Sequence, residues 1–270
     1  MAKRTVKFSM VNPHAAGIDV GSKSHWVCAG ESSEQIQEFS VFSEDLHRMA
    51  KWLKSLGVQT IAMESTGFYW KSLLLLLQDY GFEVILVHAA HIKNVRGKKT
   101  DVQDCHWIWQ LHSAGLLSAS FQPDSFTDSV RTYTRHRRSL IEGAARYVSK
   151  MQKAMVRQNI HLSVVLTDIT GKSGRAIIAK ILEGERDGTK LAALADYRVK
   201  ADKATIAKAL TGHWKTEHLF ELRQAWNTYH FYQQQILECD QQIEQLLKIE
   251  IQRKGQNDLL YDGKKKAKEK

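Results

Sequence analysis

The chain has 270 residues, of which 43% are hydrophobic and 25% charged, an ordinary balance for a globular protein with room for two domains. Its formal net charge is +10 and its pI is about 9.4, which suits a polyanionic partner, most commonly nucleic acid. The three widely spaced cysteines argue against a zinc site or a disulfide framework, and no apolar stretch could serve as a signal core or a membrane span. We therefore expect a cytoplasmic protein that does not contact a membrane.

The first third of the chain predicts a mixed sheet. Three consecutive strands are predicted where short apolar stretches are separated by glycine, serine and charged residues, at 15–20, 25–30 and 35–42. Beyond them the pattern alternates, with helices at 44–56 and 68–79 and buried strands at 58–63 and 83–87. This order indicates an α/β fold in which an antiparallel meander begins a mixed sheet flanked by helices.

Four acidic residues fall at the ends of these elements. Asp19 and Glu64 each end an apolar run, whereas Asp101 and Asp104 lie three residues apart at the start of a predicted helix and share one face of it. Carboxylates from three elements supply the oxygen ligands that Mg²⁺ prefers when it also contacts phosphates, and Mn²⁺ is the alternative ion. Two such ions about 4 Å apart could serve phosphodiester transfer. The pattern leaves open whether one ion or two would bind.

The residues that follow Glu64 allow two interpretations. Ser65 and Thr66 are expected to cap the next helix. The aromatic run Phe68, Tyr69 and Trp70 could stack on nucleic-acid bases, but packing of this helix against the sheet is the favoured interpretation.

Basic residues form a stripe on one long predicted helix, which runs from about Thr127 to Gln158. At about 100° per residue, the apolar side chains fall on one side of it and the cations on the other. These cations are Arg131, Arg135, Arg138, Arg146, Lys150, Lys153 and Arg157. Because a solvated helix face normally mixes charges of both signs, this stripe favours contact with backbone phosphates. Lys98 and Lys99 precede Asp101 and could screen the carboxylates or guide phosphates toward them.

The remaining sequence predicts further helices. Short ones are expected at 173–183 and 202–210, and a second long helix from about Glu217 to Ile251 carries an apolar seam of the coiled-coil type. The lysine-rich end is expected to be disordered. The predicted domains are a catalytic domain, a helical region for nucleic-acid binding and oligomerisation, and a basic tail, at 1–124, 125–252 and 253–270.

Several segments resemble the DEDD transposases of bacterial insertion sequences, which are bridge-RNA-guided recombinases: GIDVGSKSHWV, AMESTGFYW, KTDVQDC, LHSAGLL and DITGKSGRAIIAKILEGERD. The resemblance extends from about residue 15 to about residue 250. It implies a RuvC-like (RNase H-like) domain whose catalytic, metal-binding D, E, D, D set falls on Asp19, Glu64, Asp101 and Asp104. It also implies Mg²⁺, a structured noncoding guide RNA, and dimers or tetramers assembled on donor and target DNA in the bacterial nucleoid.

One feature of this family has no counterpart in the chain. Family members continue past the second long helix into a domain that supplies a serine nucleophile, and no residue here corresponds to that serine. One hypothesis is therefore a recombinase whose acidic quartet is incomplete alone. The other is a catalytically incomplete, nucleic-acid-binding fragment that only assembles with full-length subunits. A sugar-kinase or actin-like ATPase, suggested by GIDVGS, would need a second glycine-rich phosphate loop, which the sequence lacks.

Overall fold

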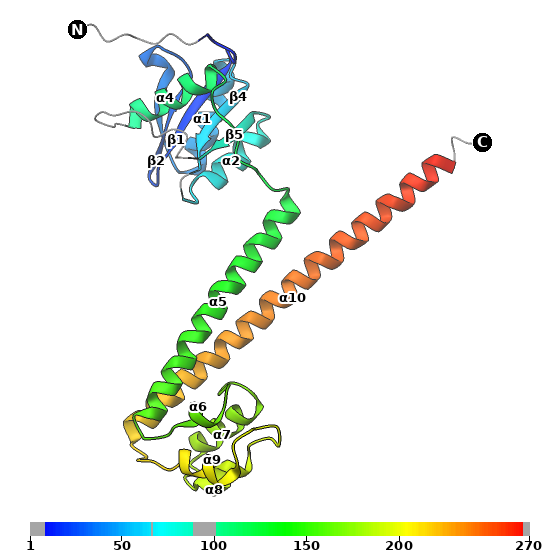
Figure 1. Ribbon diagram of the computed structural model, residues 1–270. Coiled ribbons are helices and arrows are strands. Elements are labelled where there is room, and N and C mark those ends of the chain that lie inside the picture. Colours follow the sequence, from blue (N-terminus) through cyan, green and yellow to red (C-terminus); the bar gives the residue numbers. More distant parts are fainter. Residues whose placement is uncertain (1–8, 66, 89–100, 267–270) are drawn as a thin grey trace. The chain divides into compact units, whose positions relative to one another are not determined.

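The computed structural model describes residues 9–65, 67–88 and 101–266, with residues 256–266 described by their backbone alone. The chain divides into two compact units (Figure 1): unit 1 is Met1–Gln122 and unit 2 is Pro123–Lys270. From the sequence, we predicted the boundary between the two units two residues later, after residue 124.

Unit 1 is built on a five-stranded sheet with the order β3-β2-β1-β4-β5. The strands are β1 (Ala15–Val20), β2 (Ser24–Cys28), β3 (Ile36–Ser40), β4 (Thr60–Glu64) and β5 (Glu83–Val87), with a short 3₁₀ helix, η1 (Ser33–Gln35), before β3. The first three strands pair antiparallel, whereas β4 lies parallel to both β1 and β5. The predicted α/β, RNase H-like mixed sheet with its opening meander is therefore confirmed.

Helices cover both faces of this sheet. On one face, α1 (Ser43–Ser55) and α2 (Trp70–Asp79) pack their leucines against Ile18, Ile61 and Met63. On the other face lies α4 (Asp101–Ser113), whose buried side chains contact the sheet residues of opposite parity, such as Ala15 and Ala62. The alternation of side chains along each strand thus gives unit 1 two apolar layers.

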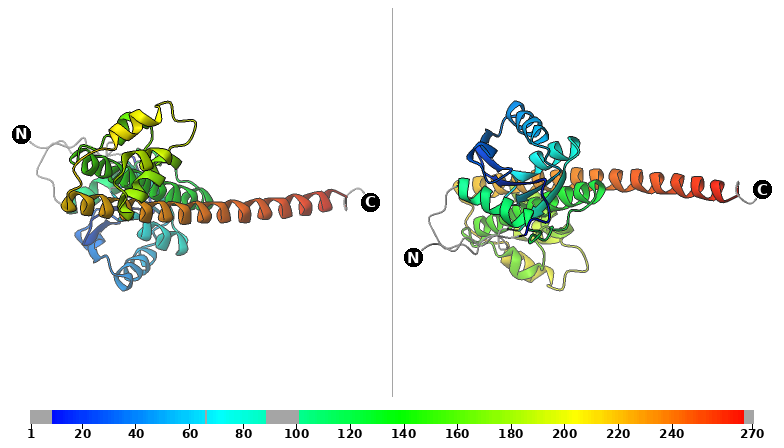
Figure 2. Two further views of the ribbon diagram at one scale, coloured as in Figure 1. Left: turned by 90° about the horizontal axis from the view of Figure 1, so that it is seen from below. Right: turned by 90° about the horizontal axis from the view of Figure 1, so that it is seen from above.

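Unit 2 is helical and is organised by two long antiparallel helices, α5 (Ser125–Val156) and α10 (Thr216–Lys266). Their register follows from the ion pairs Arg157–Glu221 and Arg137–Asp240, in which the residue number falls on one helix as it rises on the other. The C-terminal turns of α10 run past the start of α5 (Figure 2). The prediction of two long helices after the sheet domain is confirmed.

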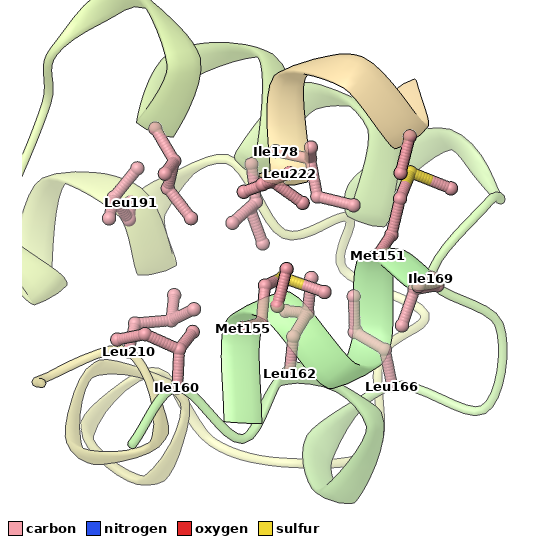
Figure 3. Packing of buried hydrophobic residues seen from close by; sticks show 14 of the residues in the cluster. Met151, Met155, Ile160, Leu162, Leu166, Ile169, Ile178, Leu191, Leu210 and Leu222 are labelled. Carbon is pink, nitrogen blue, oxygen red and sulfur yellow. The ribbon is translucent and has the colours of Figure 1, made fainter. Parts of the chain in front are cut away.

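Four shorter helices pack around the end of this pair where α5 stops and α10 begins. They are α6 (Leu162–Val165), α7 (Lys172–Glu183), α8 (Gly188–Ala193) and α9 (Lys203–Ala209). Apolar side chains from all of these segments meet in one core, in which Ile178 and Leu222 lie between Leu191 and Met151 (Figure 3). Figure 3 also shows Met151 and Met155 of α5 in this core, so α5 itself contributes side chains to it. We call this cluster the tip core and the part of unit 2 around it the tip.

The structure differs from the sequence prediction at three helices. Residues 253–270 were predicted to be disordered, and up to Lys266 this prediction is wrong. The helix α10 continues to that residue rather than ending near Ile251. Lysine, glutamine and leucine are good helix formers, so a polar composition is as compatible with an exposed helix as with disorder. Two short helices, α6 and α8, were not predicted. The Asp187 carboxylate caps α8 by accepting from the Thr189 N–H at 2.8 Å.

No helix in the part of the chain that the structure describes combines the length and the apolarity needed to cross a bilayer.

Candidate functional site

Asp19 and Glu64 lie at the ends of two neighbouring parallel strands. In the register between β1 and β4, Ile18 pairs with Met63, and these are the residues immediately before the two acids. Parallel strands end at the same edge of a sheet, so both carboxylates leave the sheet at the edge where catalytic side chains of α/β folds commonly lie.

The same two acids point to one face of the sheet. Side chains alternate along a strand, so Asp19 shares a face with Ala15, and Glu64 shares a face with Ala62. Both alanines belong to the layer covered by α4 rather than to the layer of α1 and α2. Strand periodicity therefore directs both carboxylates toward the side on which α4 packs.

Gly17 allows α4 to lie directly on β1. A Cβ atom at this position would come within 2.3 Å of the backbone nitrogen of Trp109 and within 2.7 Å of the carbonyl oxygen of Cys105. These are main-chain atoms of the helix, which cannot move aside as a flexible side chain could. The glycine two residues before Asp19 thus sets how closely α4 approaches the sheet.

The direction of α4 places its first turn toward Asp19 and Glu64. Near the end of α4, His112 Nε2 lies 3.0 Å from the hydroxyl of Thr60, the first residue of β4. The C-terminal end of α4 therefore lies at the beginning of the strands, and its N-terminal end lies toward their carboxyl ends. Asp101 and Asp104 occupy this first turn, where Asp101 is exposed and Asp104 is half-buried.

Electrostatics also link β1 with the start of α4. The pKa of the Cys105 thiol is raised by its hydrogen bond with Cys28, by burial, and by the nearby charge of the Asp19 carboxylate. Cys105 directly follows Asp104, so Asp19 is within electrostatic reach of the turn that carries the acidic pair. Both cysteines are buried and free.

The four acids come from β1, β4 and α4, and their oxygen donors are chemically suited to Mg²⁺ or Mn²⁺. Among the residues that the structure describes, however, no group of three or more His, Cys, Asp or Glu side chains is placed so that it could hold a metal ion. The fold thus directs the predicted acids toward one end of one face of unit 1, without forming a closed ligand set.

A family model described as a transposase, for DEDD transposases of the IS110 type, matches residues 16–160. The match covers more than half of the chain and contains the β1, β4 and α4 acids together with all of α5. The chain belongs to this transposase family. No individual curated protein matches it. Family membership makes the chain an insertion-sequence transposase, a type of enzyme that binds and recombines DNA.

In this transposase, the segment after Glu64 is only partly as predicted. Ser65 does not cap α2, because its hydroxyl donates to the Val87 carbonyl at 3.2 Å and the helix begins at Trp70; Thr66 lies outside the described residues. Trp70 packs against the α1–α2 layer, as expected. Phe68 and Tyr69 instead remain 75% and 41% exposed, with their ring centroids 4.6 Å apart.

The predicted basic stripe lies on α5, and all seven of its cations are exposed. Two of them are ion-paired: Arg138 Nε lies 3.0 Å from Glu142, and Arg157 Nη1 lies 2.8 Å from Glu221. The Lys150 ammonium lies 4.5 Å from the centroid of the Tyr147 ring. Exposed pairs of this kind leave the charges accessible, so the transposase presents a cationic face along α5, here called the basic face.

Lys98 and Lys99 lie outside the described residues. Neither Gly17 nor His112 was predicted to shape the site, although the small residues of AAGIDV indicate that another element approaches β1 closely. The cavity between α5 and α10 was not predicted either, because it depends on the register of the two helices.

Proposed function

We propose that this transposase uses Asp19, Glu64, Asp101 and Asp104 to hold Mg²⁺, or Mn²⁺, during DNA strand cleavage and exchange. The observation that carries the proposal is the parallel register of β1 and β4, which brings two carboxylates to one sheet edge and to the face covered by α4.

The chain's own residues have defined roles in this proposal. Asp19 and Glu64, fixed on rigid strands, would set the position of the site, and Asp101 and Asp104 would close it from α4. Carboxylates gathered at one site would repel one another unless a cation neutralised them. When bound, the ion would stabilise charge on the attacking and leaving oxygens of the phosphodiester.

The basic face would hold the phosphates of donor and target DNA and of a structured guide RNA. Seven exposed cations on one helix supply a sequence-independent attraction whose strength falls with salt. Such a face binds backbone rather than bases, so the choice of DNA target would come from base pairing with the guide RNA.

Assembly as dimers or tetramers is proposed through the long helices. α10 carries apolar side chains that unit 2 leaves exposed, among them Leu237 (50%), Ile249 (62%) and Ile251 (70%). A second copy could cover them, and the assembly would act on DNA in the bacterial nucleoid.

Metal binding by the full chain tests the acidic site without requiring catalysis. Asp19→Asn and Glu64→Gln should each weaken Mn²⁺ binding, which electron paramagnetic resonance measures. Losing a residue that only hydrogen-bonds to a metal ligand typically lowers metal affinity by roughly 10- to 100-fold, and losing a ligand itself should lower it more. Glu44→Gln, an exposed acid on α1, is the control and should bind Mn²⁺ as the wild type does. Unchanged binding by the Asp19 and Glu64 variants would refute the site.

Cleavage of insertion-sequence ends, in the presence of the RNA that copurifies and of the serine-bearing domain of another family member, separates an enzyme from a binding protein. We expect cleavage that requires Mg²⁺ and is lost in Asp19→Asn. Binding of DNA and RNA with no metal-dependent cleavage would instead leave the alternative, a catalytically incomplete nucleic-acid-binding fragment.

The salt dependence of duplex binding tests the basic face. Replacing Arg131, Arg135 and Arg138 together by glutamine should flatten the log–log salt slope by about 2.7 if each contacts one phosphate. Replacing Lys180, Lys190 and Lys208, exposed lysines of α7, α8 and α9, removes the same charge and should leave the slope nearly unchanged. Equal changes in the two triple variants would mean that net charge alone drives binding.

A further inference from the structure

A cavity of about 510 Å³ lies between α5 and α10, within unit 2. Its α5 wall carries Lys150, Lys153 and Arg157, and its α10 wall carries Phe220, Gln224 and Thr228. This volume is typical of a small-molecule site, which usually combines apolar walls with a few placed polar groups. The cavity continues the C-terminal end of the basic face.

The charges in the cavity favour an anion. Its one acidic side chain, Glu221, is held by Arg157, whose Nη1 lies 2.9 and 2.8 Å from the two carboxylate oxygens. This contact is also the main reason that the pKa of Glu221 is lowered. The acid and the arginine neutralise each other, so the ammonium groups of Lys150 and Lys153 give the cavity its net positive charge.

The α10 wall adds groups suited to a base. The Phe220 ring is 61% exposed, and an exposed aromatic ring beside cations offers a stacking face for a base whose phosphate is held nearby. The exposed Gln224 amide carries both a donor and an acceptor, which is what the edge of a nucleobase requires. Exposed hydrophobic side chains that occur singly are common on protein surfaces. The evidence for a nucleotide site is therefore that Phe220, Gln224 and two lysines line one cavity, and not that Phe220 is exposed.

We infer that this cavity binds one unpaired nucleotide of a DNA or RNA strand, with its phosphate at Lys150 and Lys153 and its base stacked on Phe220. In a duplex the faces of each base are covered by its neighbours, so a stacking ring selects an unpaired base. The inference rests on the proposed nucleic-acid binding by the basic face and adds a preference that charge alone does not produce. The basic face attracts any phosphate backbone, whereas the cavity distinguishes an unpaired base from a paired or missing one.

The test compares two strands with equal numbers of phosphates. One is a dT oligomer about 12 nucleotides long, within the roughly 4–16 nucleotides of known single-strand sites, and the other is an abasic oligomer of the same length. Fluorescence anisotropy with the full chain should show that dT binds about 5- to 150-fold more tightly, the range expected for one base–aromatic stack. Phe220→Ala should abolish this preference, and Phe220→Trp should retain it.

Phe231 provides a matched control. It lies on the same helix, about three turns away and on the same face, it is 60% exposed, and it does not line the cavity. Phe231→Ala should keep the full preference for dT. Replacing both Lys150 and Lys153 by glutamine should weaken binding of both oligomers and flatten the single-strand salt slope by about 1.4. An rU oligomer in parallel identifies which strand, DNA or RNA, the cavity prefers.

Failure of this inference is distinguishable from failure of the basic face. If both oligomers bind with steep salt dependence but equally, or if Phe220→Ala keeps the preference, the nucleotide site is refuted and the basic face survives. If neither oligomer binds in a salt-dependent way, both proposals fail. A second copy of the chain could occupy the cavity instead, and light scattering tests this by measuring the oligomeric state. If the wild type is a dimer without any preference for dT, and Phe220→Ala is a monomer, the cavity is a contact between copies.

Discussion

The two units assemble their charged residues in different ways. In unit 1, the four acids come from three elements, β1, β4 and α4. The first and the last of them, Asp19 and Asp104, are 85 positions apart in the sequence. In unit 2, six of the seven cations of the basic face lie on the single helix α5, and the seventh, Arg157, directly follows its last residue. The acidic site therefore depends on strand register and helix packing, whereas the basic face depends only on α5 being helical.

This difference predicts how each site responds to distant changes. A substitution that shifts α4 by a fraction of its diameter should disturb the acids without touching them. The basic face should tolerate loss of the tip core better, because its cations lie along α5 and need no partner element to share one side. Substitutions at Ile178, His112 and Gly17 test this contrast.

Ile178→Ala should have the largest effect on unit 2. The side chain is fully buried in the tip core, and truncation of a buried isoleucine costs about 2–5 kcal/mol. Hydrogen exchange should show faster exchange throughout α7 and α8, while the amides of β1 and β4 exchange as in the wild type. Ile141→Ala, at a 41% exposed position on α5, is the control and should change little. Faster exchange in β1 would mean that the two units unfold together.

His112 should make the stability of unit 1 depend on pH. Burial lowers its pKa from 6.5 to about 4 in the folded protein. The unfolded chain therefore binds the proton first as the pH falls, so stability is fully present above pH 6.5 and declines progressively toward pH 4. The loss is on the order of 3 kcal/mol across this window. Urea unfolding at pH 7 and pH 5 measures the part of this loss that falls above pH 5.

The test of this pH effect is a His→Gln substitution at His112, and its control is the same substitution at an exposed histidine. His112→Gln should reduce the pH dependence between pH 7 and pH 5 and leave the part that comes from His25 and His106, whose pKa values burial also lowers. It should also lower the stability at pH 7 through the lost contact with Thr60. His136→Gln, at an exposed position on α5, should leave the wild-type pH profile intact. A His112→Gln profile as steep as that of the wild type would assign the effect to other groups.

Gly17→Ala should have a smaller but more informative effect. The new methyl group meets backbone atoms of α4, so the helix must move, at a cost of about 1–3 kcal/mol. Mn²⁺ affinity should fall as well, because α4 carries Asp101 and Asp104. Gly255→Ala is the matched control: nothing lies within 4 Å of its Cβ position on α10, and the change should stabilise the helix by up to about 1 kcal/mol. Unchanged Mn²⁺ binding in Gly17→Ala would separate α4 packing from the acidic site.

Local patterns predicted most elements well. The predicted helix at 44–56 is observed as Ser43–Ser55, and the predicted strand at 83–87 is observed with those bounds, because each carries a clear apolar period. The extent of α10 was missed because polar, lysine-rich sequence has no period to follow, and α8 was missed because it is only six residues long. Phe68 and Tyr69 were misjudged because an aromatic run looks the same whether its rings face a core or solvent.

The mixed α/β character of unit 1, the long helices of unit 2, the candidate acids and the cationic side of α5 could all be predicted from the order and spacing of neighbouring residues. Which acids share a face could not, because the register of β1 with β4 and the contact of α4 with Gly17 join residues distant in sequence. The same holds for the cavity beside Phe220, whose walls come from two helices separated by the whole tip of unit 2. Periodicity is a local property, whereas proximity between elements depends on packing that no short stretch of sequence contains.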